Sequence, residues 1–235
     1  MLHFLGIGAQ KAGTTWLYEM LSRHPGIAFP AGKEVHFWDA FYQRGLPWYD
    51  TCFPDAPGRL NGEITPAYAM LPAERIAEIK QAYPELRLLY LLRNPLQRAW
   101  SSALMALGRA EMTLDEASDA WFIDHFRSAG SLGRGDYATC LTHWRAFYAE
   151  DCWRVFFYEQ IRDNPVALLG SCCDLLGLAR EPFLSDCLQH MPRKVFSGAG
   201  VVLRPTLLPV LREIYYPKIE QLSWLLGQDL SHWKI

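Results

Sequence analysis

The chain has 235 residues, of which half are hydrophobic and a fifth are charged, as is usual for a globular domain. Its formal net charge is −2, and its lysines and arginines form no long run, which argues against a general nucleic-acid or anionic-membrane binder but not against a local anion pocket. No stretch approaches the roughly 18–20 apolar residues of a membrane span, and the first residues are too short and too quickly interrupted for a signal peptide. We therefore expect a single cytoplasmic domain over residues 1–235.

The six cysteines form no C-x-x-C pair, and no group of cysteines and histidines has the spacing of a zinc site. We expect reduced and mostly buried thiols in a reducing compartment. The cysteines are Cys52, Cys140, Cys152, Cys172, Cys173 and Cys187.

Short apolar runs alternate with amphipathic stretches along the chain, as in βαβ units. The first predicted strand is 4–8, and helix 14–23 follows it with four apolar side chains on one face. A second strand is predicted at 59–64, and a helix opened by proline at 72–83. Residues 86–92 are nearly all apolar, as in a parallel strand buried on both faces. The remaining predicted elements are helices at 94–107, 113–126 and 137–148, a strand at 153–158, a helix at 165–176, a loop-like segment at 191–203 and a helix at 207–226.

This order of elements predicts an α/β fold, a doubly wound central parallel sheet with helices on both faces. Sheets of this kind bind ligands outside the carboxyl ends of their strands. The segments after Ile7, Ile64, Leu92 and Phe157 are therefore the places where functional residues are expected.

The loop after the first strand, Gly8 to Thr15, is similar to a nucleotide P-loop, G-x-x-x-x-G-K-[ST]. Both glycines have the right spacing, but Thr14 stands where the P-loop has its lysine, and Lys11 supplies a cation inside the loop. Backbone N–H groups of such a loop and the positive end of the following helix favour a bound anion. The sequence thus predicts a P-loop-like phosphate-binding loop. The alternative is a glycine-containing strand-to-helix turn with an exposed lysine.

The strand at 86–92 is followed by Arg93, where P-loop kinases and ATPases carry an acid that holds Mg²⁺. An arginine at this place repels a metal ion and attracts an anion. Ser101 lies eight residues further on, about two turns into the next helix, so the two side chains could hold one phosphate together. The alternative is a surface arginine and an ordinary helix serine.

These two motifs resemble those of sulfotransferases that use 3′-phosphoadenosine 5′-phosphosulfate (PAPS). Residues 11–15 (KAGTT) resemble the loop that binds the 5′-phosphosulfate, and the segment from Arg93 to Ser101 resembles the motif that binds the 3′-phosphate. The resemblance is closest to the carbohydrate type, the heparan sulfate 3-O- and N-sulfotransferases. It extends to residues 33–39 (KEVHFWD), to Gly45 with the Trp-Tyr pair that follows it, and to residues 63–68 (EITPAY).

The resemblance implies a reaction as well as a fold. PAPS would be the co-substrate and PAP the product, no metal would be needed, and the sulfuryl group would move in line to a hydroxyl or amine of a carbohydrate, lipid or other small acceptor. The implied catalytic residues are Glu34, as general base, with Lys11 and His36. The predicted PAPS-binding residues are Lys11, Ala12, Gly13, Thr14, Thr15, Trp16, Arg93, Ser101, Arg193 and Lys194, the last two being our own suggestion and not a match to a family motif. The predicted acceptor-binding residues are Lys33, His36, Asp39, Trp48, Glu63 and Tyr137, of which Trp48 is included as an aromatic residue near the proposed site and Tyr137 as a residue that could reach it.

The sequence departs from the heparan enzymes at two places. Ile64 stands where they have a lysine, and their disulfide-closed hairpin with a K-G-R loop near the end is missing, so Arg193 or Lys194 would have to close over the nucleotide. For this reason we do not expect a highly sulfated polysaccharide as the acceptor. Two other functions stay open: a small-molecule kinase using ATP and Mg²⁺, and a non-catalytic nucleotide-binding module. The first would need a lysine after Gly13, and the second would not need Glu34.

Overall fold

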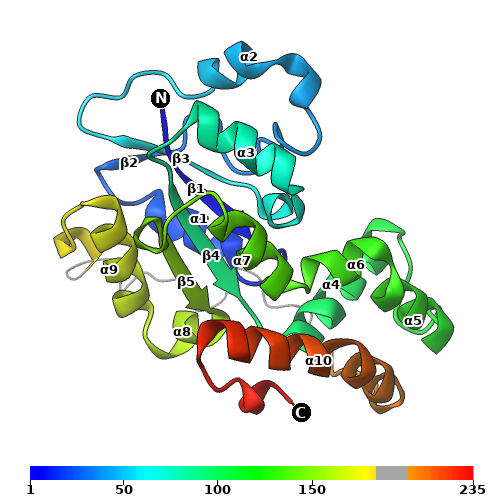
Figure 1. The fold of residues 1–235 in the computed structure, drawn as a ribbon. Helices are drawn as coiled ribbons and strands as arrows, with labels where there is room; N and C mark the ends of the chain where they lie inside the picture. Colours follow the sequence, from blue (N-terminus) through cyan, green and yellow to red (C-terminus); the bar gives the residue numbers. More distant parts are fainter. Residues whose placement is uncertain (184–200, 235) are drawn as a thin grey trace.

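Five parallel strands form one sheet in the order β2-β3-β1-β4-β5 (Figure 1). The strands are β1 (Leu2–Gly8), β2 (Ile27–Ala28), β3 (Leu60–Ile64), β4 (Arg87–Leu92) and β5 (Trp153–Phe157). β1 and β4 are central, and their apolar side chains are buried on both faces of the sheet. The chain leaves β1 and returns to either side of it, so the ends of β1, β3 and β4 meet at a topological switch point.

The computed structural model describes residues 1–183 and 201–234. Arg193, Lys194, Cys187 and most of the predicted loop at 191–203 lie outside these residues. In the part of the chain that is described, none of the helices has both the length and the hydropathy needed to span a bilayer.

Helices cover both faces of the sheet, with α3 and α7 in front of it and α1 behind it in the view of Figure 1. This arrangement confirms the predicted doubly wound fold. The helices are α1 (Thr14–Leu21), α2 (Leu46–Thr51), α3 (Ala73–Ala82), α4 (Pro95–Arg109), α5 (Asp119–Arg127), α6 (Ala129–Arg134), α7 (Tyr137–Arg145), α8 (Tyr158–Asp163), α9 (Pro165–Leu176) and α10 (Leu208–Leu226).

Several elements differ from the sequence prediction, and the short helices α6 and α8 were not predicted. The helix predicted at 113–126 begins only at Asp119, because Ser118 caps it and the Glu116 carboxylate accepts from the backbone and hydroxyl of Thr113 in a separate turn. β2 and α2 were not predicted, since they are only two and six residues long. Tyr158, predicted as the end of a strand, instead begins α8.

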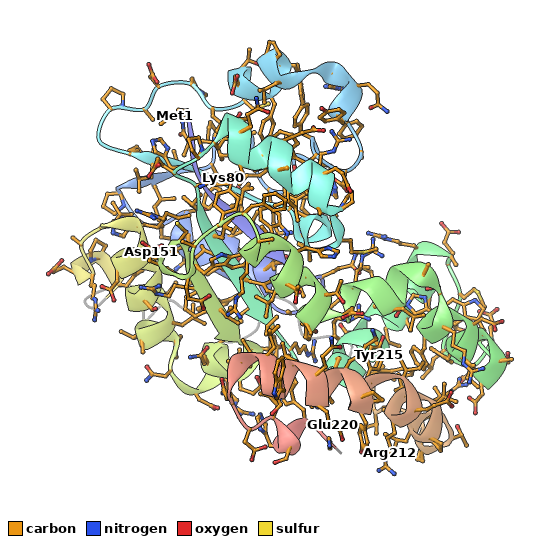
Figure 2. All side chains as sticks on the ribbon, viewed as in Figure 1. Met1, Lys80, Asp151, Arg212, Tyr215 and Glu220 are labelled. Atoms are coloured by element: carbon orange, nitrogen blue, oxygen red, sulfur yellow. The ribbon has the colours of Figure 1, made fainter. Side chains whose placement is uncertain are left out.

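A buried arginine joins three helices beside the sheet. Arg98 of α4 is fully buried, and its Nη2 donates to the backbone oxygen and the hydroxyl of Ser131 on α6 at 3.0 and 3.1 Å. The same nitrogen donates to the hydroxyl of Tyr215 at 3.3 Å. Tyr215 lies on α10, where Figure 2 labels it. Gly135 permits this packing, because a Cβ there would lie 2.6 Å from the Tyr215 ring. These contacts hold α10 beside the carboxyl end of β4.

Candidate active site

The loop after β1 ends in a glycine that both its backbone conformation and the close approach of α8 explain. Gly13 has a φ of 98°, and a Cβ there would lie 2.5 Å from Cδ1 of Ile161. It is also the residue before α1, so no side chain caps the first N–H groups of this helix. Uncapped N–H groups at a helix start are a ready site for an anion.

Lys11 lies in the middle of this loop among other cations. Its backbone has a φ of 67°, and its carbonyl oxygen accepts a hydrogen bond from Nη1 of Arg93 at 3.1 Å. Burial lowers the pKa of Lys11, and the charges of Arg93, Arg109 and Lys33 lower it further. A bound anion would relieve this repulsion, so the field around the loop favours a phosphate or sulfate group.

Arg93 is held on several sides and still has a donor without a partner. Its guanidinium carbon lies 4.5 Å from the centre of the Tyr158 ring, and its carbonyl oxygen accepts from the hydroxyl of Tyr137 at 2.8 Å. Nε of Arg93 is buried and has no hydrogen-bond partner among residues 1–183 and 201–234. Ser101 lies two turns into α4 and is nearly buried. A buried, unpaired guanidinium N–H fits the predicted phosphate contact.

The segment 33–39 is tied to the end of β3, since the N–H of Glu34 donates to the carbonyl of Ile64 at 3.1 Å. Four non-glycine residues have a positive φ among those that are described. Three of them are Lys11, Glu34 and His36, the three predicted catalytic residues, with φ values of 67°, 65° and 58°. Such a backbone costs of order 1 kcal/mol or more per residue and persists where the surroundings require it.

The side chains of this segment form a chain of charges. Lys33 makes an ion pair with Glu34, and the other carboxylate oxygen of Glu34 lies 3.6 Å from Nε2 of His36. Nδ1 of His36 is hydrogen-bonded to Asp39 at 2.9 Å. The Glu34 side chain is 41% exposed, so its carboxylate is open to an incoming acceptor. Lys33, Glu34, His36 and Asp39, four of the predicted site residues, are thus brought together.

Two predicted acceptor contacts lie where an acceptor would not reach them. Glu63 is fully buried, and its carboxylate accepts from the hydroxyls of Thr65 at 2.6 Å, Tyr68 at 2.7 Å and Tyr49. Burial raises the pKa of Glu63, and the hydroxyl donors oppose this shift. Tyr137 is buried and uses its hydroxyl on Arg93. Both residues therefore stabilise the segments that carry the site and do not line it.

The other predicted residues take different places. Ala12, Thr14 and Trp16 are buried around the start of α1, so this stretch would contact an anion through its uncapped backbone N–H groups. Thr15 is partly exposed on the same helix. Trp48 of α2 is partly buried, and the guanidinium of Arg44 lies 4.5 Å from its ring centre.

Two arginines near the site were missed by sequence reasoning. Arg109 ends α4, and its charge helps to lower the pKa of both Lys11 and Arg134. Arg134 ends α6, and the nearby charge of Asp39 opposes this lowering of its pKa. Burial and the charge of Arg98 lower the pKa of Arg134. Its Nε is buried and unpaired within the described part of the chain. No motif marks these arginines, since only the packing of α4 and α6 brings them near the loop.

Tyr158 was also missed, although its position carried a signal. It follows β5, and the segment after Phe157 was one of the places where functional residues were expected, but no residue of that segment was assigned a role. Its ring supports Arg93 and packs near Gly13.

Both a protein family and individual proteins are similar in sequence to this chain. Residues 3–202 match the family described as sulfotransferase domain. Human heparan sulfate glucosamine 3-O-sulfotransferase 6 is 30% identical over 186 residues, 74% of this chain and 52% of that protein. The bifunctional heparan sulfate N-deacetylase/N-sulfotransferase of Drosophila melanogaster is 29% identical over 225 residues, 83% of this chain and 21% of that protein. The chain thus spans about half the length, or less, of these curated relatives.

Solved structures show the same architecture. A sulfotransferase from Alicyclobacillus acidocaldarius has a TM-score of 0.76 at 24% identity, with 100% of this chain and 99% of that chain covered. A mouse sulfotransferase complexed with PAP has a TM-score of 0.65 at 16% identity, with 96% and 89% covered. At these identities the likeness concerns the fold alone. The family match covers most of the chain and confirms the resemblance seen in the loops after β1 and β4: the chain belongs to the sulfotransferase domain family.

Proposed function

We propose that this chain transfers a sulfuryl group from PAPS to a hydroxyl or amine of a carbohydrate, lipid or other small acceptor. One observation carries the proposal: an uncapped helix start with Lys11, the cation Arg93 and the exposed carboxylate of Glu34 converge at neighbouring strand ends. The helix start with Lys11 suits the 5′-phosphosulfate of PAPS, and Arg93 suits its 3′-phosphate. The carboxylate of Glu34 suits the acceptor. Membership of the sulfotransferase domain family supports the same reading.

In the proposed reaction, Glu34 and Lys11 would have different roles. Sulfuryl transfer resembles phosphoryl transfer, with attacking and leaving oxygens in line and negative charge growing on the leaving phosphate. Glu34 would take the proton of the acceptor as its oxygen or nitrogen bonds to sulfur. Lys11 and the N–H groups at the start of α1 would stabilise the charge left on the 5′-phosphate when the sulfur–oxygen bond breaks. Preorganised donors of this kind contribute about 3–4 kcal/mol each.

The two alternative functions fit the site less well. A kinase of the P-loop type needs an acid at the end of the buried strand for Mg²⁺, and the residue that follows β4 is Arg93. A module that only binds nucleotides does not require an exposed carboxylate on a left-handed backbone, as Glu34 has.

The first test separates the sulfotransferase from the kinase. We expect PAP to raise the thermal stability of the protein in the presence of EDTA. At a hundredfold excess of PAP over its Kd, linkage predicts a gain of about 2.7 kcal/mol in the free energy of unfolding. A thermal-shift series with PAP, ATP–Mg²⁺ and AMP measures this. A strict requirement for Mg²⁺ in binding would favour the kinase and contradict the proposal.

The surroundings of Glu34 also bear on the acceptor. Of the aromatic side chains near it, Trp38 and Tyr49 are buried in the core, whereas Phe41 and Tyr42 are exposed. Arg44 packs on the Trp48 ring. We propose an acceptor that is held by apolar surface and carries at most a single anionic group, because Arg109 and Arg134 suffice for one such group but not for a chain of them.

A comparison of acceptors tests this proposal. Turnover on desulfated glycans and on simple hydroxylated lipids or aromatics should exceed turnover on heavily sulfated glycans, and added salt should change it little. Binding of a polyanion would instead weaken steeply as salt is added, since many counterions are released. Efficient and salt-sensitive sulfation of a heparin-like chain would show that the acceptor has been misjudged.

A further inference from the structure

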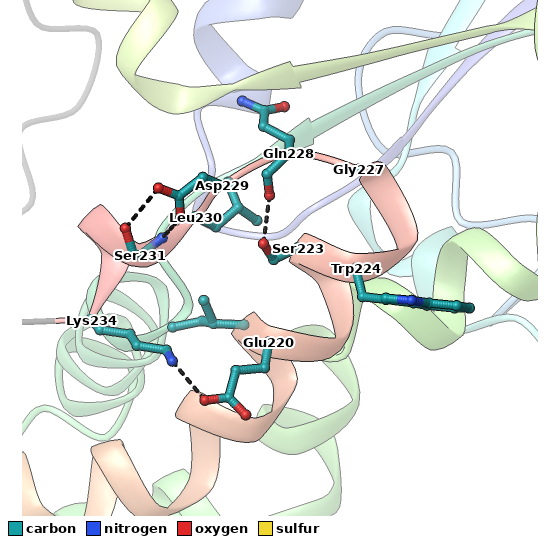
Figure 3. Close-up of a pocket in the computed structure, with 10 residues that line it drawn as sticks. Glu220, Ser223, Trp224, Gly227, Gln228, Asp229, Leu230, Ser231 and Lys234 are labelled. Atoms are coloured by element: carbon teal, nitrogen blue, oxygen red, sulfur yellow. Dashed lines mark hydrogen bonds and ion pairs between the residues drawn. The ribbon is translucent and has the colours of Figure 1, made fainter.

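The segment after α10 folds back onto the helix and ends beside the candidate nucleotide site. Gly227, with a φ of 60°, ends α10, and the next residues return along it (Figure 3). Ser223 donates to the carbonyl of Gln228, and Lys234 pairs with Glu220 at 2.6 Å. A short 3-10 helix, η6 (Ser231–Trp233), forms the end of this fold. The segment is therefore fixed to α10 on both sides of η6.

Trp233 of η6 is buried, with 1% of its surface exposed, and makes two hydrogen bonds to different elements. Its carbonyl oxygen accepts from Nδ2 of Asn94 at 2.9 Å. Its indole Nε1 donates to Glu159 at 3.1 Å. The indole ring also packs against Phe157, with ring centres 5.7 Å apart.

Of these two partners, Asn94 is the sequence neighbour of Arg93, and Glu159 is the sequence neighbour of a residue that supports the Arg93 side chain. Asn94 directly follows Arg93, and its Oδ1 caps α4 by accepting from the N–H of Leu96. Glu159 directly follows Tyr158, the residue whose ring lies under the Arg93 guanidinium. Trp233 thus connects the backbone that carries Arg93 with the element that supports its side chain.

We infer that Trp233 is a positioning residue for the 3′-phosphate site: it holds the end of β4 and the start of α8 at the separation in which Arg93 meets the 3′-phosphate. The inference rests on the proposed function. Charged hydrogen bonds need accurate placement, and sites lose affinity when their supporting contacts loosen by a fraction of an ångström. Trp233 itself does not touch the nucleotide in this scheme, so its removal should weaken only the part of the affinity that Arg93 supplies.

Two variants each remove one of the hydrogen bonds. Trp233→Phe keeps a ring against Phe157 but loses the donor to Glu159. Asn94→Ser keeps a good cap for α4, because serine is a preferred N-cap residue, but is too short to reach the carbonyl of Trp233. The matched control is Trp224→Phe, since Trp224 lies on the exposed side of α10 with 83% of its surface free (Figure 3).

The readout compares PAP with AMP, which differ only in the 3′-phosphate. We expect each variant to raise the Kd of PAP about tenfold, the loss typical of one hydrogen bond to a charged group, while the Kd of AMP and that of the control stay unchanged. In an Arg93→Ala background, Trp233→Phe should have no further effect on PAP. Equal losses for PAP and AMP, or no loss for either, would overturn the inference.

Failure of the proposed function looks different. Wild-type protein that binds PAP no more tightly than AMP would show that no 3′-phosphate site exists, and would overturn the proposal together with the inference. Selective PAP binding that is insensitive to both variants would overturn the inference alone.

Discussion

Replacing Glu34 by glutamine is expected to lower the turnover number by a factor of about 10²–10⁴ and to leave the Kd of PAP unchanged. Glutamine has nearly the shape of glutamate but does not accept a proton at neutral pH. Because the backbone of Glu34 is tied to Ile64 and its side chain is exposed, the substitution should not disturb the fold. Steady-state sulfation rates with saturating PAPS, and calorimetric titration with PAP, measure the two quantities.

A matched control exists for the unusual backbone at this position. Glu111 is also a glutamate with a positive φ, 54°, and it is exposed and outside the proposed site. Glu111→Gln should therefore keep the wild-type turnover number. If Glu34→Gln retains more than about a tenth of the wild-type rate, a base worth 10²–10⁴ lies elsewhere, and His36 is the next candidate.

Replacing Arg93 by alanine is expected to weaken PAP by about 2–5 kcal/mol, the usual cost of removing one partner of a desolvated charge pair. This corresponds to about thirtyfold to a few thousandfold in Kd. AMP, which lacks the 3′-phosphate, should lose far less. The buried and unpaired Nε of Arg93, and its support by Tyr158, are the reasons to expect a large effect.

The control for this substitution lies on the same strand. Arg87 begins β4 at the opposite end, where it contacts Cys152, so Arg87→Ala should leave PAP binding intact. Both Kd values come from calorimetry, with melting temperatures recorded to monitor folding. If Arg93→Ala weakens PAP and AMP equally, Arg93 acts as a general scaffold residue and the 3′-phosphate assignment is wrong.

Several features of the protein were predictable because their determinants are local in sequence. The leucines of β4 follow one another without polar residues between them, which is typical of a parallel strand that is buried on both faces. The structure confirms β4 as a central parallel strand. The loop after β1 has its glycines, Lys11 and helix start within eight residues, so its likeness to a phosphate loop could be read directly. Segment 33–39 was identified by resemblance, and the structure brings its charged side chains together.

Local patterns misjudged residues whose role depends on burial. Glu63 and Tyr137 are polar residues in motifs, and polar residues in motifs are easily assigned to a ligand. Their surroundings bury both, and the hydroxyls around Glu63 and the carbonyl of Arg93 use their hydrogen-bonding groups instead. The helix predicted at 113–126 starts late for a different, local reason, since the Glu116 carboxylate accepts hydrogen bonds from Thr113 in a separate turn.

The sequence by itself determined the alternation of the longer strands and helices, the glycine-containing loop with Lys11 and the cation that follows β4, because each depends on hydrophobic periodicity or on a short motif. Only the tertiary structure decided which distant residues join them. Arg109, Arg134, Tyr158 and Trp233 come from four separate elements, and no sequence motif indicates that they contact one another or the loop after β1. Packing of helices against the sheet sets these distances, and packing depends on the shapes of all the buried side chains together.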